Sequence, residues 1–324
     1  MNFTELDKRG TVEGFGIVKS ATRKTSSKGD AYLDMTLADS SGEINAKLWN
    51  YNELMHGIYE TNMLVKVRGM VSEYNGADQL RIDRIRRVNE EDNVNIADFV
   101  KSADYSGEKM FDELKSIAEG FTDKELSRLV TYILDDKKEQ LLYWPAAFKL
   151  HHAIRGGLLL HTLSIVKLAE GVCSIYPFID RDLLLAGAIL HDIAKLTEYN
   201  AGETGIASGY TAKGNLIGHL AEGAMTVRKA SETLGISSET SMLLEHMLLS
   251  HHGEPDFGAA VRPMFIEAEV LSELDMMDAR IYEMKDEILK KTDSEGFTDR
   301  MWSMDNRKLF DHKRVDLNKK TQLF

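Results

Sequence analysis

Histidine is the residue best suited to chemistry in this 324-residue chain, and its distribution is uneven. Eight of the ten histidines lie between residues 151 and 252. Imidazole is the commonest protein ligand for a transition metal, and carboxylates complete many such sites. The pair His191-Asp192 lies in the middle of this cluster, which predicts a metal site with the pair at its centre.

The spacing of the ligand-type residues indicates that several helices contribute to this site. From residue 161 to residue 252 they recur about every 30 residues, and a last one follows at residue 275. These residues are His161, His191, Asp192, His219, His251, His252 and Asp275. Apolar residues at helical spacing predict helices over residues 157–172, 181–194, 216–234, 238–251 and 264–290. Each helix would bring one or two ligands to the core of a bundle, where bundles build their metal sites.

Asp192 is expected near the protein interior because it follows eight apolar or small residues, 183–190. A buried aspartate is costly unless it is paired or bound to a metal. Neighbouring residues on a helix point about 100° apart, so His191 and Asp192 can bind one ion together, or Asp192 can bridge two. Nitrogen and oxygen ligands without a thiolate suit Mn, Fe, Co or Zn, and so many histidines disfavour Mg alone.

The first ninety residues show the two-residue alternation of strands instead. Strands are predicted over residues 10–25, 32–37, 44–48, 64–71 and 79–82, with a short helix over 51–58. Three strands, a short helix and two strands follow the plan of an OB-fold, a five-stranded β-barrel whose open face binds oligonucleotides or oligosaccharides. We therefore expect a multi-domain chain of separate β and α parts. Its expected parts are a barrel (10–90), a helical connector (91–145), an all-α metal-binding bundle (146–295) and a basic tail (296–324).

Aromatic residues and cations are the candidate binding groups of the barrel. Phe15, Tyr32, Trp49 and Tyr74 could stack on bases, because every base offers a π-face, and Arg81 is one of the cations on the last strand. The alternative is that the aromatics fill the barrel and the cations are solvated. Residues 1–90 carry 13 basic and 13 acidic side chains, whereas the whole chain has a net charge of −12. Nucleic acid is therefore expected at a local site and not over the whole surface.

The ligand-type residues resemble a known pattern. His161, His191-Asp192 and Asp275 are similar to the H…HD…D signature of the HD-domain metal-dependent phosphohydrolases, and residues 156–163 and 190–195 resemble the local motifs of that superfamily. The additional histidines at 219, 251 and 252 resemble those of members that hold two ions. An OB-fold ahead of an HD domain is similar to the YhaM-type 3′-to-5′ exoribonucleases, a resemblance that covers residues 10 to 290.

The resemblance implies an activity and its cofactors. The activity is removal of nucleotides from the 3′ end of single-stranded RNA, with single-stranded DNA as a second candidate substrate, by in-line attack of a metal-activated water. The cofactors are two divalent ions, first of all Mn or Co, while Fe and Zn also suit the ligand types.

The resemblance also implies roles for particular residues. The expected ligands of the first ion are His161, His191, Asp192 and Asp275, where Asp275 is preferred to Asp278. The expected ligands of the second ion are His219 with His251, His252 or both, a choice that the sequence leaves open. Asp192 and Lys195 are the candidate catalytic residues, with Lys195 contacting the scissile phosphate. Three residues before the first ligand are expected to touch the substrate, namely His151, His152 and Arg155.

Two other classes of function remain open. One is an HD-type phosphohydrolase acting on a free or cyclic nucleotide, for which an OB-fold would have no evident use. The other is a single-strand-binding protein with an inert HD domain, against which the complete ligand set argues.

Composition indicates the setting of the protein. The N-terminal stretch has no apolar secretory region, no apolar run approaches the length of a membrane span, and the lone Cys173 suits a reducing compartment. We therefore expect a cytoplasmic protein with no membrane partner. The basic tail and the acidic helix over 264–290 suggest by their charges a contact between subunits, and hence a homo-oligomer.

Overall fold

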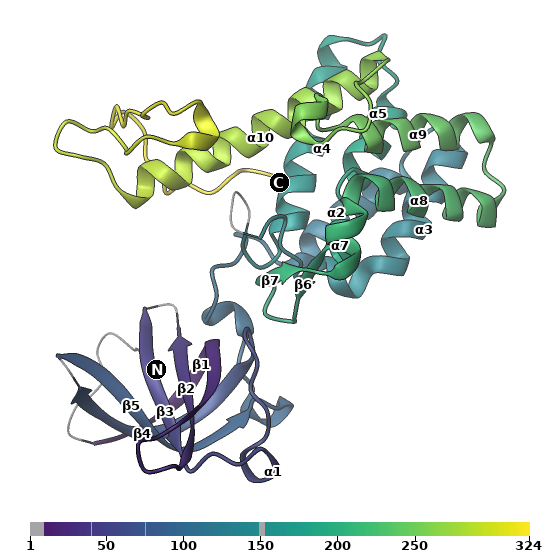
Figure 1. Cartoon of the computed structure of the whole chain (residues 1–324). Coiled ribbons are helices and arrows are strands. Elements are labelled where there is room, and N and C mark those ends of the chain that lie inside the picture. Colours follow the sequence, from purple (N-terminus) through teal and green to yellow (C-terminus); the bar gives the residue numbers. More distant parts are fainter. Residues whose placement is uncertain (1–9, 40, 75, 149–152) are drawn as a thin grey trace. The chain divides into compact units, whose positions relative to one another are not determined.

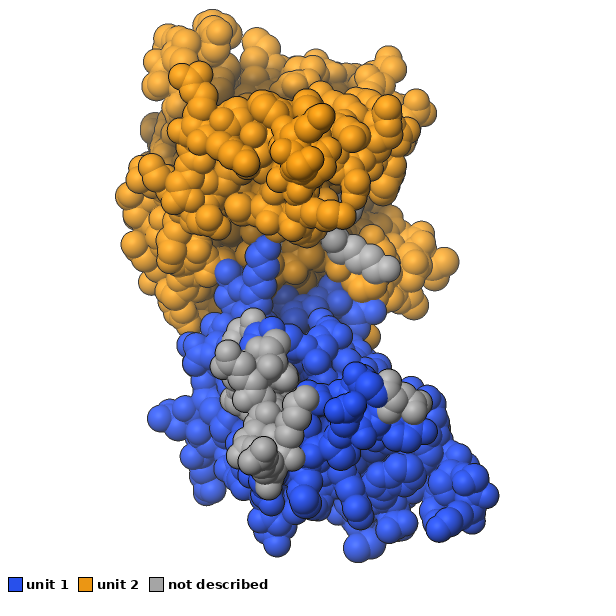
Figure 2. All heavy atoms as spheres, turned by 90° about the vertical axis from the view of Figure 1, so that its left-hand side faces the viewer, with its two compact units in different colours: residues 1–102, 201–208 blue, residues 103–200, 209–324 orange. Residues whose placement is uncertain are grey.

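The computed structural model describes residues 10–39, 41–74, 76–148 and 153–324 (Figure 1). The chain divides into two compact units. One unit runs to Ser102 and also includes Ala201–Ser208, and the other comprises Ala103–Asn200 and Gly209–Phe324, as the two colours of Figure 2 show. The first unit is a β-barrel and the second is helical, which confirms the expected fold class.

The barrel contains the five expected strands and the short helix after the third. These elements are β1 Thr11–Thr25, β2 Ala31–Ala38, β3 Glu43–Trp49, α1 Glu53–His56, β4 Leu64–Tyr74 and β5 Ala77–Arg87. In β3 the side chains of Ile44, Ala46 and Leu48 are buried in the barrel core, while the residues between them face outward or are half-buried. This is the two-residue alternation that the sequence shows.

The barrel closes because β1 is long enough to pair with two neighbouring strands, β4 and β2. Its first half, Thr11–Ile17, pairs with β4, and its second half, from Ile17 to Thr25, pairs with β2, with a register shift between Val18 and Ser20. The strand order is β1-β2-β3-β5-β4, in which only the β3–β5 pairing is parallel. Closure leaves no strand edge free to pair with another chain, and this strand order is that of an OB-fold.

The barrel unit also includes segments outside the five strands. Val100 packs with Ile17 and Leu64 in a small second core, against which Phe99 and Ile206 also pack. The side-chain amide of Asn62 donates a hydrogen bond of 2.7 Å to the carbonyl oxygen of Ile206. These contacts explain why residues 201–208, distant in sequence, belong to the same unit.

The helical unit consists of nine helices within the described residues, and the five expected ones are among them. The helices are α2 Gly107–Glu119, α3 Lys124–Leu141, α4 Gly157–Ile175, α5 Arg181–Leu190, α6 Lys195–Glu198, α7 Ala212–Leu216, α8 Gly218–Leu234, α9 Ser238–Ser250 and α10 Ile266–Lys290. A short hairpin of β6 Tyr199–Ala201 and β7 Ala207–Tyr210 lies between α6 and α7 in the sequence and was not expected.

The range 91–145, expected as a connector, is divided between the units. Residues up to 102 belong to the barrel unit, whereas α2 and α3 belong to the helical unit. Both helices have an apolar face that is buried, for example Phe111 in α2 and Leu129 in α3, so they are parts of the helical core.

Helices α4 and α5 form the centre of the helical unit. Every residue of α5 except Arg181 is buried, and so is most of the first half of α4. By length and composition α4 is apolar enough to cross a membrane, but its burial and its polar His161 are those of a core helix. A helix that is apolar on all sides is expected at the centre of a bundle.

The range 296–324, expected as a basic tail, follows α10, the long helix that Figure 1 shows leading into the yellow C-terminal segment. Isolated bridges join Phe297 to Phe310 and Met301 to Arg307. Met301 and Met304, with Leu309, form a small core against the last turns of α10. We call residues 293–311 the C-terminal segment.

Candidate metal centre

The seven ligand-type residues come from five places, each of which is a helix or the turn that ends one. His161 lies in α4, His191 and Asp192 follow α5, and His219 is in the first turn of α8. His251 and His252 follow α9, and Asp275 lies in α10. The ligands converge because these helices pack against one another in the helical unit.

The first group of ligand atoms belongs to His161, His191 and Asp275. The Nε2 atoms of the two histidines are 3.4 Å apart, and the Nε2 of His161 is 3.1 Å from an oxygen of Asp275. Two nitrogens bound about 2.1 Å from one tetrahedral ion lie about 3.4 Å apart, so this arrangement fits a shared ion.

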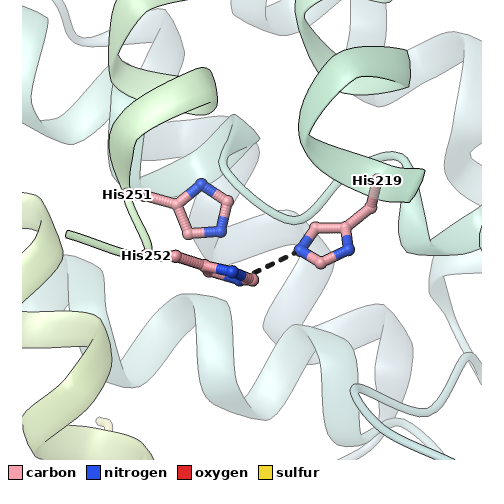
Figure 3. A group of neighbouring side chains, drawn as sticks. All are labelled: His219, His251 and His252. Atoms are coloured by element: carbon pink, nitrogen blue, oxygen red, sulfur yellow. Dashed lines mark hydrogen bonds between the residues drawn. The ribbon is translucent and has the colours of Figure 1, made fainter. Parts of the chain in front are cut away.

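The second group belongs to His219, His251 and His252 (Figure 3). The Nε2 atoms of His219 and His252 are 3.3 Å apart, as the dashed line in Figure 3 marks. The sequence left open which of His251 and His252 points inward. Because α9 ends at Ser250, both rings can turn toward His219, and both belong to the group.

Asp192 lies between the two groups. One carboxylate oxygen, Oδ2, is 3.3 Å from the Nε2 of His191 and 3.6 Å from that of His161. The other, Oδ1, is 3.4 Å from the Nε2 of His219 and 3.8 Å from that of His251. A carboxylate that faces one set of ligands with each oxygen is placed to bridge two ions, which is the second arrangement that the sequence allowed.

Among the buried atoms at this centre that have no hydrogen-bond partner in the described residues are the Oδ1 of Asp192 and the Nε2 of His251. A buried polar atom without a partner costs free energy, and metal coordination removes that cost. Burial also holds the pKa of His251 well below its usual value, so its ring is neutral and its lone pair is available. The residues therefore fit a divalent ion at each group.

The protonation of His161 is coupled to metal binding at the first group. Burial alone would lower the pKa of His161, but hydrogen bonds to Asp275 and Asp278 outweigh it and raise the pKa to about 10. A metal ion must displace this proton before it can bind at the first group. Affinity for the ion there rises with pH for this reason.

The other ring nitrogen of each histidine has an acceptor. The Nδ1 atoms of His191, His251 and His252 each meet a backbone carbonyl oxygen at 2.8 to 2.9 Å. His161 and His219 use carboxylates instead: Asp278 is 2.7 Å from the Nδ1 of His161, and Glu198 is 2.9 Å from that of His219. Such acceptors fix the tautomer that leaves Nε2 free for a metal, and a carboxylate also makes the ring more basic.

Lys195 forms a buried ion pair with the bridging carboxylate. Its Nζ is 2.6 Å from the Oδ2 of Asp192, and its backbone carbonyl accepts a hydrogen bond from the indole of Trp144. Burial alone would raise the pKa of the Asp192 carboxyl, but the charges of Lys195 and His191 hold it well below its usual range. Asp192 is therefore an anion, the form that binds metal.

The centre opens into a pocket of about 780 Å³. Lys195, Asp275 and the three histidines of the second group line it, together with several aromatic side chains. These aromatics are Phe148, Tyr199, Tyr210, Phe257 and Trp302. The volume is in the range of small-molecule sites, and the polar groups are concentrated at the metal-type ligands.

Other residues expected to touch the substrate are placed differently. The guanidinium of Arg155 lies 5.3 Å from the ring of Tyr143 and is not among the described residues that line the pocket. His151 and His152 lie outside the described residues. No sequence pattern marks Glu198, although it lies one helical turn after Lys195, and Asp278 was expected only as a less favoured ligand than Asp275.

The barrel carries a second cluster of binding groups. The rings of Tyr32 and Trp49 stack with centroids 4.7 Å apart, and the Nζ of Lys47 lies 5.2 Å and 5.9 Å from them. The same Nζ lies 6.0 Å from the exposed ring of Tyr74. Arg81 pairs with Lys47 in the β3–β5 register. We call Tyr32, Lys47, Trp49 and Tyr74 the aromatic face.

Phe15 does not belong to the aromatic face. Its ring meets Phe99 edge to face, with centroids 6.1 Å apart, and packs against the small second core of the barrel unit. This is the packing role that the sequence left open for the barrel aromatics.

Comparison with known proteins finds one family model and several relatives that resemble this chain. The HD domain family matches residues 158–280. The 3′-5′ exoribonuclease YhaM of Listeria welshimeri is 37% identical over 300 residues, which cover 93% of this chain and 95% of that protein. The YhaM protein of Bacillus subtilis is 35% identical and covers 92% of this chain and 94% of its own length. A solved OB-fold domain of replication protein A from Methanococcus maripaludis is 20% identical, covers 28% of this chain and 94% of that domain, and has a TM-score of 0.23.

The match and the site define an HD-domain protein whose histidines and aspartates form a divalent-metal centre. At this identity over nearly the whole length, the chain belongs to the YhaM family of 3′-5′ exoribonucleases.

Substitutions at the centre should separate the two groups of ligands. His252→Ala removes one ligand of the second group only, so we expect it to lower the metal content by one ion per chain. Asp192→Asn weakens both groups, because an amide cannot offer an anionic oxygen to each. Metal content after dialysis, measured by mass spectrometry, checks both outcomes. Asp136→Asn, at an exposed position in α3, is the matched control. Full metal content in Asp192→Asn would contradict the bridging role.

The two carboxylates behind the histidines should tune metal affinity. We expect Asp278→Ala and Glu198→Ala each to weaken metal binding about 10- to 100-fold, at the first and the second group respectively. Asp278→Asn and Glu198→Gln keep an acceptor but lose the charge, so their effects should be smaller. Calorimetric titration of the metal-stripped protein measures these affinities. Equal effects of the amide and alanine variants would mean that charge, and not ring orientation, is what matters.

Proposed function

We propose that this chain is a metal-dependent exoribonuclease that removes nucleotides from the 3′ end of single-stranded RNA and releases nucleoside monophosphates. One observation carries the proposal: a buried carboxylate, Asp192, faces a separate group of metal-type ligands with each of its oxygens. Membership of the YhaM family supports the substrate and the direction of degradation. Single-stranded DNA, which offers the same phosphodiester and the same bases, is a second candidate substrate.

The proposal includes two divalent ions, one at each group. Mixed imidazole and carboxylate ligands without a thiolate suit Mn²⁺ or Co²⁺, with Fe and Zn also compatible. The position of Asp192 supports two ions, because each of its oxygens faces a different group of metal-type ligands. When bound, such ions stabilise the charge on the phosphoryl oxygens and lower the pKa of the attacking water.

The residues of this chain then have distinct tasks in hydrolysis. Asp192 and the histidines would bind the two ions and fix their positions in the pocket. The ammonium of Lys195, buried beside Asp192 and lining the pocket, offsets negative charge that develops on the non-bridging phosphate oxygens. Burial of this charge strengthens the effect, because little water screens it. These groups act on phosphate and not on bases, so the activity does not depend on RNA sequence.

The barrel contributes affinity for the strand. The aromatic face offers two stacked rings and a lysine, with Arg81 in register with that lysine. Stacking and phosphate neutralisation are how OB-folds hold single strands without sequence preference. Because the barrel and the metal centre are parts of one chain, RNA bound by the barrel is at a raised local concentration for the pocket.

We also propose that the protein acts in the cytoplasm and self-associates. The reducing compartment is proposed because Cys173 is the only cysteine. Met301 and Met304 pack on α10 of their own chain, and this packing does not support a contact between the tail and the acidic helix of another subunit. Self-association is therefore proposed without an assigned surface.

A time course on labelled RNA tests the activity. The metal-stripped full chain should be inactive, and Mn²⁺ should restore it. A 3′-label should then appear at once as a mononucleotide, while a 5′-labelled strand should shorten progressively. We expect Asp192→Asn to lower the rate at least about a thousandfold. Turnover of free or cyclic nucleotides alone would indicate a different HD enzyme, and RNA binding without hydrolysis would indicate a binding protein.

Loss of the stacked pair should weaken strand binding without affecting the chemistry. We expect the double variant Tyr32→Ala/Trp49→Ala to bind single-stranded RNA about 10- to 100-fold more weakly, since each stacked base contributes about 1–3 kcal/mol. Fluorescence anisotropy with the metal-stripped protein measures this affinity. The rate on bis(p-nitrophenyl) phosphate should stay unchanged, because this small substrate does not need the barrel. Tyr132→Ala, an exposed tyrosine of the helical unit, is the control. Unaltered RNA affinity would assign the aromatic face a structural role.

A further inference from the structure

Trp302 has the largest ring of the aromatic side chains that line the pocket, none of which has a role in the proposed mechanism. It lies in the C-terminal segment, within the range expected from its charge to be a basic tail. It lines the pocket together with the metal-type ligands, and 78% of its surface is exposed. An indole at the rim of a pocket presents a broad apolar surface to whatever enters.

The backbone around Trp302 is anchored while its ring is free. Met301 and Met304, on either side, are buried against the end of α10. Ser303, the next residue, donates a hydrogen bond of 2.6 Å to Glu283 of α10. No ring contact involves the indole among the described residues. A tryptophan that served folding would be buried like its neighbours, so this position is suited to a ligand instead.

Helix α10 carries both a ligand-type residue of the metal centre, Asp275, and the residue that anchors the backbone next to Trp302, Glu283. Asp275, Ala279 and Glu283 follow one another at intervals of four residues and therefore lie on one face of α10. Eight residues of helix rise about 12 Å, so the anchor of Trp302 lies about that far along the helix axis from the ligand Asp275. Asp275 and Trp302 both line the pocket, so a ligand that enters it can contact both. Arg280, on the same rim, adds a positive charge that suits a polyanion.

Three of the other four aromatics of the pocket contact one another, and the fourth, Phe257, is 62% exposed and has a smaller ring than tryptophan. The ring of Tyr210 meets those of Phe148 and Tyr199, with centroids 6.1 Å and 5.2 Å away. Tyr199 is buried. Trp302 has the larger ring system and the higher exposure, and stacking grows with the area of overlap.

We propose that Trp302 forms a nucleobase subsite of the pocket: its indole stacks on the base of the nucleotide whose phosphate lies at the metal centre. This inference rests on the proposed function for the identity of the substrate as a nucleic acid. The subsite accepts any base, because stacking requires only a π-face. It makes the enzyme sensitive to a missing base at the end of the strand, which the metal centre alone does not detect.

Binding of two small probes tests the subsite without requiring hydrolysis. Adenosine 5′-monophosphate and ribose 5-phosphate carry the same phosphate but differ in the base, and calorimetry with the full chain and Mn²⁺ measures both affinities. We expect the wild type to prefer the nucleotide about ten-fold, and Trp302→Ala to bind the two about equally. Trp302→Tyr, which keeps an aromatic ring, should retain most of the preference.

The control is Phe310→Leu, an exposed aromatic of the same segment that is not among the pocket-lining residues, and it should keep the full preference. The inference is overturned if Trp302→Ala still prefers the nucleotide or if the wild type does not distinguish the two probes. It is also overturned if Trp302→Ala loses as much affinity for ribose 5-phosphate as it loses for adenosine 5′-monophosphate. Hydrolysis of RNA is measured on the same preparations. A wild type that prefers the nucleotide but does not degrade RNA would disprove the proposed function and leave the subsite standing.

Discussion

The carboxylate of Asp192 is the constraint on which the rest of the helical unit depends. It is an anion at the centre of a bundle, and an isolated buried charge is among the most expensive features a fold can contain. Four imidazole nitrogens and the ammonium of Lys195 lie within 4 Å of it. Helices α4, α6 and α8 and the turns that follow α5 and α9 each supply a group that lowers that cost, so these contacts both stabilise the fold and assemble most of the metal centre.

Much of the fold was predictable from the sequence, because it depends on local periodicity. The alternation in Ile44, Ala46 and Leu48 predicts a strand, and the apolar run before His191 predicts a buried helix. The ligand set was predictable for a different reason. Histidines and aspartates at regular intervals on apolar helices have few roles other than metal binding, and their pattern resembles that of a known superfamily.

The remaining features depend on packing between distant residues. Asp278 meets the far side of His161, and Glu198 does the same for His219, because of how whole helices are oriented. No period or motif marks such a contact. The C-terminal segment has no regular pattern either, and Trp302 reaches the pocket only because the residues beside it pack on α10. Phe15 and Trp49 are both aromatic residues of strands, and only tertiary contacts distinguish a packing role from a surface role.

The spread of the ligands along the chain has a consequence for the cell. The residues around Asp192 come from five places between positions 161 and 275, so contacts of long sequence separation must form before all of them meet. A nascent, misfolded or partly digested chain cannot hold the ions in this arrangement, since metal sites of this kind do not exist in unfolded protein. A nuclease built in this way cannot damage RNA until the chain has been synthesised beyond Asp275 and has folded, and proteolysis within this region switches it off.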